Sequence, residues 1–168
     1  MCRADLPSAA QLDDAIWLIN LGVLLLRKSQ LEKAEGAFRK SISLDPQHAL
    51  AHYCFGHILA AKGDAVGAEA EYRTALALDP KYVSARINLG NLLKDKGDAV
   101  GAEAEYRTAL VLDPKNVNAH IHLGELLKSK GDAVGAEAEY RTVLALDPKN
   151  ALAHTKLGIV LAAKGHVV

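Results

Sequence analysis

A block of 19 residues occurs three times in this chain with almost no change. The block KGDAVGAEAEYRTALALDP begins at Lys62, Lys96 and Lys130, so its copies start 34 residues apart. Each later copy differs from the first at a single position. A fixed period of about 20–50 residues is typical of arrays in which small units stack in line and contact mainly their neighbours. We therefore expect a repeat array.

Each period contains two apolar segments with helical spacing, separated by Lys-Gly-Asp and closed by Asp-Pro. The glycine suits the left-handed residue that ends a helix, the aspartate caps the next helix, and the proline disfavours further helix. At the start of the chain, Ser8 and Gln11 predict a capping box, and Leu31–Leu44 is predicted to be a second helix. A glycine in the first turn of each later second helix is unexpected, because it costs up to about 1 kcal/mol relative to alanine. The pattern predicts an all-α solenoid of antiparallel helix pairs.

Composition excludes several classes of protein. Twenty basic and 20 acidic residues cancel, which argues against an electrostatic nucleic-acid binder. Cys2 and Cys54 form no CxxC pattern and favour a reducing, cytoplasmic location. The most apolar stretch, residues 16–26, is interrupted by Asn20 and Gly22 and is shorter than the roughly 20 residues of a membrane span. We expect a soluble protein without a signal peptide, a membrane partner or a nucleic-acid partner.

Recurring residues give the chain a family resemblance. A glycine recurs in the first helices, preceded by leucine or phenylalanine and followed three positions later by leucine. The second helices contribute an alanine and then an aromatic residue. The recurring positions are Gly22, Gly56, Gly90, Gly124 and Gly158; Ala34, Ala68, Ala102 and Ala136; and Phe38, Tyr72, Tyr106 and Tyr140. The chain resembles the tetratricopeptide repeat family over Ala15–Val168.

The resemblance implies a right-handed superhelix and sets the predicted boundaries. Residues 1–14 would form an N-terminal extension and the start of the first helix. Four repeats would follow at 15–48, 49–82, 83–116 and 117–150, and 151–168 would be a C-terminal half-repeat helix. Small glycine and alanine side chains let paired helices approach closely, and the aromatic residue is expected to fill the space between neighbouring pairs. The family often has a bulky residue four positions before the glycine; here stand Leu18, His52, Arg86, His120 and His154.

The first helices vary much more than the second helices do. Blocks 62–80 and 96–114 agree at 18 of 19 positions, whereas the preceding helices 49–61 and 83–95 agree at only three of 13. First helices line the concave face in the resembled family, where ligands usually bind. Specialisation of this face for a ligand is the favoured interpretation. Recent duplication with drift and gene conversion is the alternative.

The resemblance also names candidate groove residues. The candidates fall into four sets: an apolar ridge, a row beside it, a second row, and two lysines at the edge. Such a surface suits an extended or helical peptide. The four sets are, in that order, Ile19, Tyr53, Ile87 and Ile121; Val23, His57, Asn91 and Glu125; Asn20, Cys54, Asn88, His122 and Lys156; and Lys94 and Lys128. The alternative is that Ile87 and Ile121 only pack against neighbouring helices. Glu125 and Lys156 are expected to face each other across adjacent repeats.

No catalytic, metal or cofactor site emerges from the sequence. Chaperone-binding relatives hold a terminal carboxylate with a lysine at the position of Ile19, and that lysine is absent. The histidines fall at spacings unsuited to one metal ion and are expected to be structural. Cys54 is interpreted as a small buried hydrophobe, and the repeated Glu69 and Glu71 as a solvated face. We expect no enzyme activity and no cofactor.

The last helix, residues 151–163, carries apolar residues and is followed by no second helix in the sequence. Leu152, Ile159, Val160 and Leu161 are expected to leave an apolar surface that either pairs in a homodimer or is covered by further sequence. A merely adhesive end is the alternative. We therefore expect a non-catalytic protein-binding scaffold, with two alternatives. One is a self-assembling structural module that uses its end faces, and the other is the targeting array of a larger enzyme.

Overall fold

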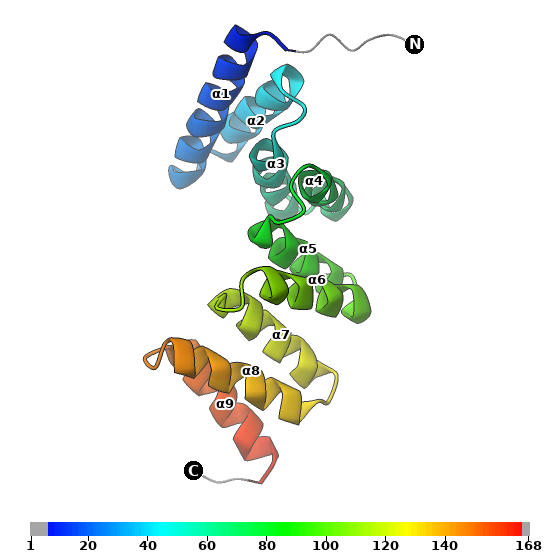
Figure 1. Ribbon diagram of the computed structural model, residues 1–168, viewed down its shortest axis with the longest axis vertical. Coiled ribbons are helices and arrows are strands. Elements are labelled where there is room, and N and C mark those ends of the chain that lie inside the picture. Colours follow the sequence, from blue (N-terminus) through cyan, green and yellow to red (C-terminus); the bar gives the residue numbers. More distant parts are fainter. Residues whose placement is uncertain (1–6, 166–168) are drawn as a thin grey trace. The chain divides into compact units, whose positions relative to one another are not determined.

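A computed structural model describes residues 7–165, and these residues form nine α-helices (Figure 1). The helices are α1 Ala9–Arg27, α2 Leu31–Leu44, α3 Ala49–Ala61, α4 Ala65–Leu78, α5 Val83–Asp95, α6 Ala99–Leu112, α7 Val117–Ser129, α8 Ala133–Leu146 and α9 Ala151–Ala163. Consecutive helices pack against each other, as α1 does on α2, α3 on α4 and α7 on α8. The predicted all-α architecture of helix pairs is confirmed. Cys2 and residues 166–168 lie outside the described range.

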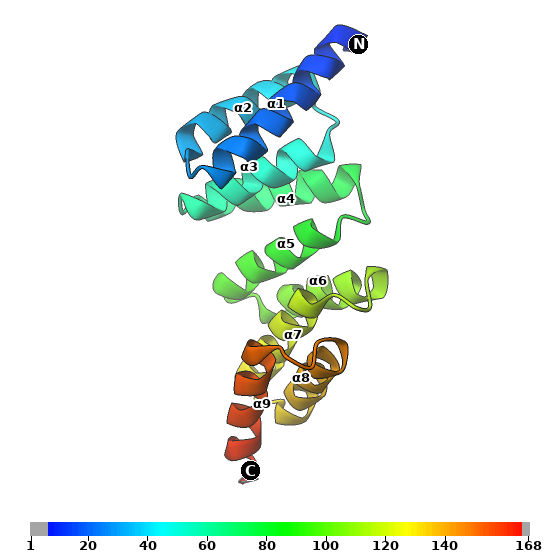
Figure 2. The ribbon, with the colours of Figure 1, turned by 90° about the vertical axis from the view of Figure 1, so that its left-hand side faces the viewer.

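The chain divides into two compact units, Met1–Ala85 and Arg86–Val168, and each is described by itself. In the first unit α2 also packs on α3, and Phe38, Ile58 and Tyr72 are buried. In the second unit α6 packs on α7 and α8 on α9, which Figures 1 and 2 draw side by side. The right-handed superhelix concerns the whole array and stays a prediction.

The helix boundaries follow the predicted stop and start signals. The turn glycines have positive φ of 83°, 85° and 84° at Gly63, Gly97 and Gly131. Ser29 occupies the same position in the first repeat with φ 56°, a conformation that disfavours residues with a Cβ. Each second helix after the first begins with an aspartate that accepts the backbone N–H three residues on, whereas Gln30 caps α2 with no side-chain hydrogen bond. The first repeat is therefore the one with the poorer turn.

The unexpected glycine in the first turn of each second helix has a local explanation. A Cβ on Gly67 would lie 2.4 Å from Oδ2 of the capping Asp64, and the other two copies show the same crowding. Glycine therefore leaves room for the capping carboxylate, whose Oδ1 accepts the Gly67 N–H at 2.9 Å. The capping box of Ser8 and Gln11 on α1 is confirmed.

The recurring glycine and aromatic residue contact each other within a pair. A Cβ on Gly124 would lie 2.8 Å from the Tyr140 ring, and one on Gly22 would lie 2.6 Å from the Phe38 ring. Each ring therefore sits on the glycine of its own pair, and Tyr106 also stacks on His122 of the next pair, in line with the expectation that the aromatic residue fills the space between pairs. Gly158 on α9 has no atom within 4 Å of such a Cβ.

Helix α1 is more apolar than the sequence interpretation allowed. By length and composition its 19 residues could cross a membrane, and few of them are buried. Ala15, Ile19 and Gly22 are buried, and α1 packs on α2 and also contacts α3. Trp17 is 62% exposed, whereas its counterparts Ala51 and Ala119 are fully buried. The absence of a membrane partner stays a prediction.

Candidate functional site

The structure places part of the predicted groove in the core. Ile19, Ile87, Ile121 and Cys54 are only 2–7% exposed, so they offer no accessible apolar floor. Ile121 packs with Val143 and Ala153. The predicted apolar ridge is therefore corrected in favour of the packing alternative. Burial also raises the pKa of the Cys54 thiol to about 11, which fits a buried hydrophobe and not a nucleophile.

In the first unit the accessible candidates are few. Asn20 and His57 are exposed and Val23 is half-buried. Tyr53 is half-buried and lies in an aromatic group, with ring centroids 4.8 Å from Tyr82 and 6.1 Å from Tyr72. These side chains could contact a partner through polar groups and aromatic edges.

In the second unit the candidates form a connected polar group. Asn91 accepts a hydrogen bond from the Tyr106 hydroxyl at 2.6 Å, and the His122 ring stacks on Tyr106 with centroids 5.8 Å apart. Burial lowers the pKa of His122, although the carboxylate of Glu125 acts in the opposite direction. Lys94 and Asn88 are half-buried, and Lys128 is exposed.

Glu125 and Lys156 face each other across adjacent repeats, as the sequence predicted. Lys156 Nζ lies 2.7 Å from Glu125 Oε1, and His122 Nδ1 lies 3.8 Å from Glu125 Oε2. Burial acts to raise the pKa of Glu125, but the hydrogen bond and charge of Lys156 outweigh it, so the pKa is lowered. Beside this pair lies a cavity of about 400 Å³ lined by Glu125, Lys128, Ser129, Tyr140 and Lys156.

In three repeats the residue four positions before the glycine has a role that the sequence interpretation missed. His52 Nδ1 lies 2.6 Å from Glu71 Oε2 and Arg86 Nη1 lies 2.9 Å from Glu105 Oε2, joining the first helix of each pair to the second. His120 makes the same contact with Glu139 at 2.6 Å. The sequence contains a signal of this pairing: in the first repeat both partner positions change together, to the apolar Leu18 and Ala37.

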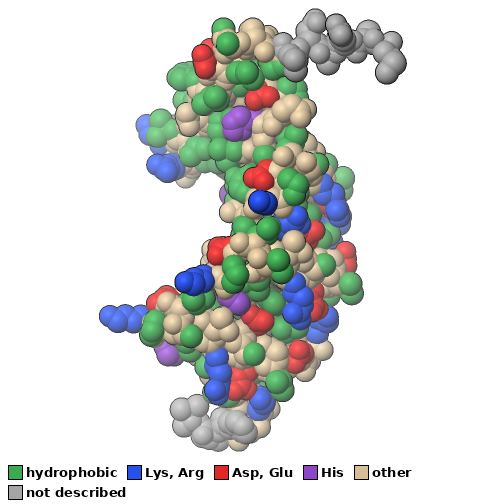
Figure 3. Space-filling model, viewed as in Figure 1, with side chains coloured by type: hydrophobic (Ala, Val, Ile, Leu, Met, Phe, Trp, Pro, Cys, Tyr) green, Lys and Arg blue, Asp and Glu red, His purple; other side chains and the backbone are tan. Residues whose placement is uncertain are grey.

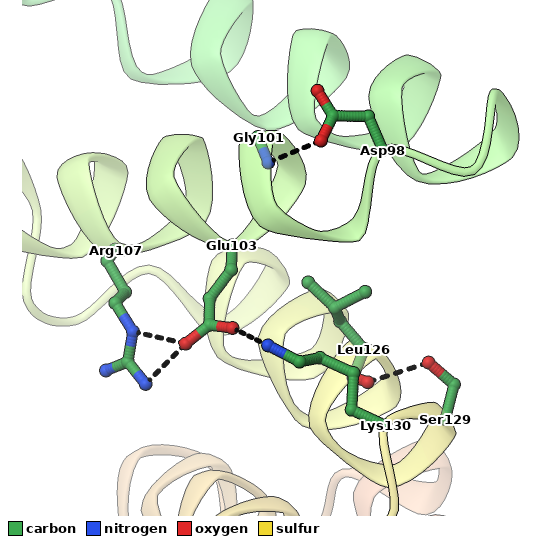
Figure 4. A network of polar contacts seen from close by, with 7 residues as sticks. All are labelled: Asp98, Gly101, Glu103, Arg107, Leu126, Ser129 and Lys130. Atoms are coloured by element: carbon green, nitrogen blue, oxygen red, sulfur yellow. Dashed lines mark hydrogen bonds and ion pairs between the residues drawn. The ribbon is translucent and has the colours of Figure 1, made fainter.

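Another glutamate in α2, α6 and α8 holds the first helix of the following repeat. Figure 4 shows Glu103 between Arg107, four residues on in α6, and Lys130 at the end of α7. Glu35 bonds Lys62 at 2.7 Å and Glu137 bonds Lys164 at 2.6 Å in the same way. The glutamates predicted to form a solvated face are partly exposed and also form ion pairs, since Glu103 is 20% exposed and is engaged on both sides.

The histidines are structural where the helices bury them. His52 and His120 are 7% and 9% exposed, and each Nε2 lies 3.0 Å from a proline carbonyl oxygen. Among residues 7–165 no group of three histidine, cysteine or acidic side chains could hold a metal ion. On the face drawn in Figure 3, side chains of both charge signs are interspersed.

Comparisons with known proteins match the chain to one family. Profiles described as tetratricopeptide repeat match residues 18–48 and 93–158, and one described as TPR repeat matches residues 56–97. Comparison with curated protein sequences gave no significant match.

Solved structures of similar fold come from several proteins. PilF of Pseudomonas aeruginosa is 22% identical, with 93% of this chain and 71% of that chain covered and a TM-score of 0.85. MamA from Desulfovibrio magneticus RS-1 is 21% identical, with 92% and 87% covered and a TM-score of 0.81. YrrB, described as a TPR protein with an unusual peptide-binding site, is 26% identical, with 91% and 79% covered and a TM-score of 0.75.

Proposed function

This chain belongs to the tetratricopeptide repeat family, whose repeats generally act as protein–protein interaction modules, and we propose that it is a scaffold that binds a protein or peptide segment on its first helices. We propose further that it acts without catalysis or cofactor, in the cytoplasm. The targeting array of a larger enzyme would use the same surface in the same way.

One observation carries the proposal: the second helices α4, α6 and α8 are almost constant, whereas the first helices vary. The constant residues have structural tasks, since Glu103 joins α6 to α7 and Glu105 joins α6 to Arg86. A binding module needs a constant framework that holds its helices in place and a surface whose residues can change to fit a ligand. The peptide-binding site described for YrrB is a property of that protein and supports a peptide ligand here by similarity.

The test uses surface residues, because replacing the buried Ile87 and Ile121 would damage the core. The double variant His57→Asp/Lys128→Glu changes two exposed first-helix positions. The matched control, Val66→Lys/Val134→Lys, changes second-helix positions that are 74% and 69% exposed. Both variants are checked for helicity by circular dichroism and then used with the wild type to capture partners from a lysate of the source organism.

A partner that the wild type and the control retain, and the first-helix variant loses, supports the proposal. Equal retention by all three proteins contradicts it and moves recognition to another surface. Absence of any partner favours the second candidate.

The second candidate is self-association through α9, in a homodimer or a structural assembly. Leu152 and Ile159 are 47% and 46% exposed, and Gly158 presents an open helix surface. Val160, which the sequence grouped with the exposed residues, is 1% exposed, so that expectation is corrected. Light scattering on Ile159→Glu tests the candidate, because a dimer through α9 would dissociate, and an unchanged mass would contradict it.

A further inference from the structure

Tyr140 carries a buried hydroxyl that has no hydrogen-bond partner among the described residues. The side chain is fully buried, and its counterpart in the preceding repeat, Tyr106, donates to Asn91 at 2.6 Å. The residue at the Asn91 position of the next repeat is Glu125. Glu125 accepts a hydrogen bond from Lys156 instead, so the tyrosine hydroxyl that is paired at Tyr106 has no such acceptor at Tyr140. A buried unpaired hydroxyl costs about 1–3 kcal/mol, which makes it an unusual feature to retain without a use.

The cavity at Tyr140 carries a positive balance. Its charged lining residues are two lysines, Lys128 and Lys156, and one glutamate, Glu125. The Ser129 hydroxyl already donates a hydrogen bond to the Leu126 carbonyl oxygen at 2.7 Å. Figure 4 shows Ser129 turned to Leu126 in this way. Burial raises the pKa of Tyr140 to about 12, so the hydroxyl is a neutral donor at physiological pH. An unsatisfied donor beside two ammonium groups is complementary to an anionic acceptor.

We propose that the cavity between α7, α8 and α9 binds the carboxylate of an acidic side chain of the partner segment, through the Tyr140 hydroxyl and the ammonium groups of Lys128 and Lys156. The proposal rests on the proposed function and names the chemistry that part of the ligand must have. The Tyr140 hydroxyl belongs to a second helix, so comparing the variable first helices does not reveal it.

Lys156 can serve the ligand at small cost. Its side chain is 30% exposed, and part-exposed ion pairs such as Lys156–Glu125 contribute about 0–1 kcal/mol. A ligand carboxylate that takes over one ammonium hydrogen bond replaces an interaction of similar strength. It gains in addition the hydrogen bond from Tyr140, which no group in residues 7–165 accepts. The hydroxyl oxygen is covered in the unliganded protein, so binding requires the side chains that line the cavity to move.

The probe is N-acetylglutamate amide, which carries a single side-chain carboxylate, titrated into ¹⁵N-labelled protein and followed by NMR. N-acetylglutamine amide is the neutral probe of the same shape. We expect shifts at Lys128, Ser129, Tyr140 and Lys156 with millimolar affinity for the acid and little response to the amide. Tyr140→Phe is expected to weaken acid binding at least fivefold, the ratio that corresponds to a hydrogen bond of about 1 kcal/mol.

Tyr106→Phe is the matched control, because it removes the same hydroxyl from a repeat where Asn91 already accepts it. It should leave probe affinity unchanged and lower the melting temperature by about 2–4 °C, whereas Tyr140→Phe should leave the melting temperature unchanged or raise it. Binding that survives in folded Tyr140→Phe overturns the proposal. Equal binding of the amide, or of inorganic phosphate at the same residues, also overturns it.

The two proposals fail separately. If a protein partner is captured through the first helices and the acidic probe leaves the cavity unchanged, only this inference is wrong. If the probe binds and the lysate yields no partner, the scaffold function is wrong while the anion site stands.

Discussion

His120 and Glu139 tie the two helices of one pair together, with 2.6 Å between Nδ1 and Oε2. The other ring nitrogen of His120 lies 3.0 Å from the Pro114 carbonyl oxygen. His120 lies between these two acceptor groups, and in the adjacent pair Arg86 donates to Glu105 from the same position. A histidine or arginine and a glutamate thus recur together where the family often has a bulky residue.

Removing Glu139 is therefore expected to destabilise the fold. Glu139→Ala should lower the free energy of unfolding by about 1–3 kcal/mol, because the buried imidazole loses its acceptor. The double variant His120→Leu/Glu139→Ala reproduces the apolar Leu18 and Ala37 of the first repeat and should cost less than the two single changes together. Urea unfolding of all three variants measures this coupling.

The exposed His154 provides the control for that cycle, since it has no glutamate partner in the residues described. His154→Leu should change the free energy of unfolding by less than about 0.5 kcal/mol. Strictly additive single changes at His120 and Glu139 would contradict the proposed pairing.

Replacing glycine by alanine is expected to have opposite effects on stability at Gly124 and at Gly158. Gly124→Ala places a Cβ 2.8 Å from the Tyr140 ring and should cost about 1–2 kcal/mol after the gain in helix propensity. Gly158→Ala meets no atom within 4 Å and should stabilise α9 by up to about 1 kcal/mol. Thermal unfolding of the two variants compares them directly, and equal effects would mean that the ring contact carries no constraint.

The first-repeat turn can be improved by copying the later ones. Ser29→Gly relieves the positive φ of 56° and should raise the free energy of unfolding by about 1 kcal/mol. Adding Gln30→Asp supplies the missing cap on α2 and should contribute about 1 kcal/mol more. Chemical denaturation checks both steps, and a loss of stability from Ser29→Gly would show that the serine side chain has another task.

His122 predicts a dependence of stability on pH. Burial lowers its pKa below the ordinary 6.5, so the unfolded chain takes up the proton first as the pH falls. The contribution is fully present above pH 6.5 and is lost as the pH falls from there through the folded value, with Glu125 and Lys94 the nearby charges that modulate it. His122→Asn should flatten the decline in unfolding free energy between pH 7.5 and 5.5, and an identical slope in both proteins would contradict this assignment.

Local signals in the sequence predicted most of the fold. The predicted helix Leu31–Leu44 has the observed bounds, and the turn glycines adopt the expected positive φ, because caps and turns depend on nearby residues. The ion pair between Glu125 and Lys156 was predicted because the two residues belong to neighbouring rows on adjacent first helices.

The groove was predicted less well, for a physical reason. Ile121 shows the apolar spacing of a ridge residue, yet the same spacing describes a side chain packed on Ala153 of the next repeat. Only the position of the neighbouring helix separates the two. The open hydroxyl of Tyr140 was equally hidden, because the sequence of its block is almost identical to that of Tyr106, which is paired.

The central claim is that the variable first helices carry recognition. The most direct measurement introduces the photoreactive residue p-benzoylphenylalanine at exposed first-helix positions, Asn20, His57 or Lys128, and at second-helix positions Val66 or Val134. Each folded variant is irradiated with the captured partner, and crosslinked product is measured by mass spectrometry. The account predicts crosslinks from the first-helix positions and none above background from the valines. Crosslinks mainly from the valines would contradict it.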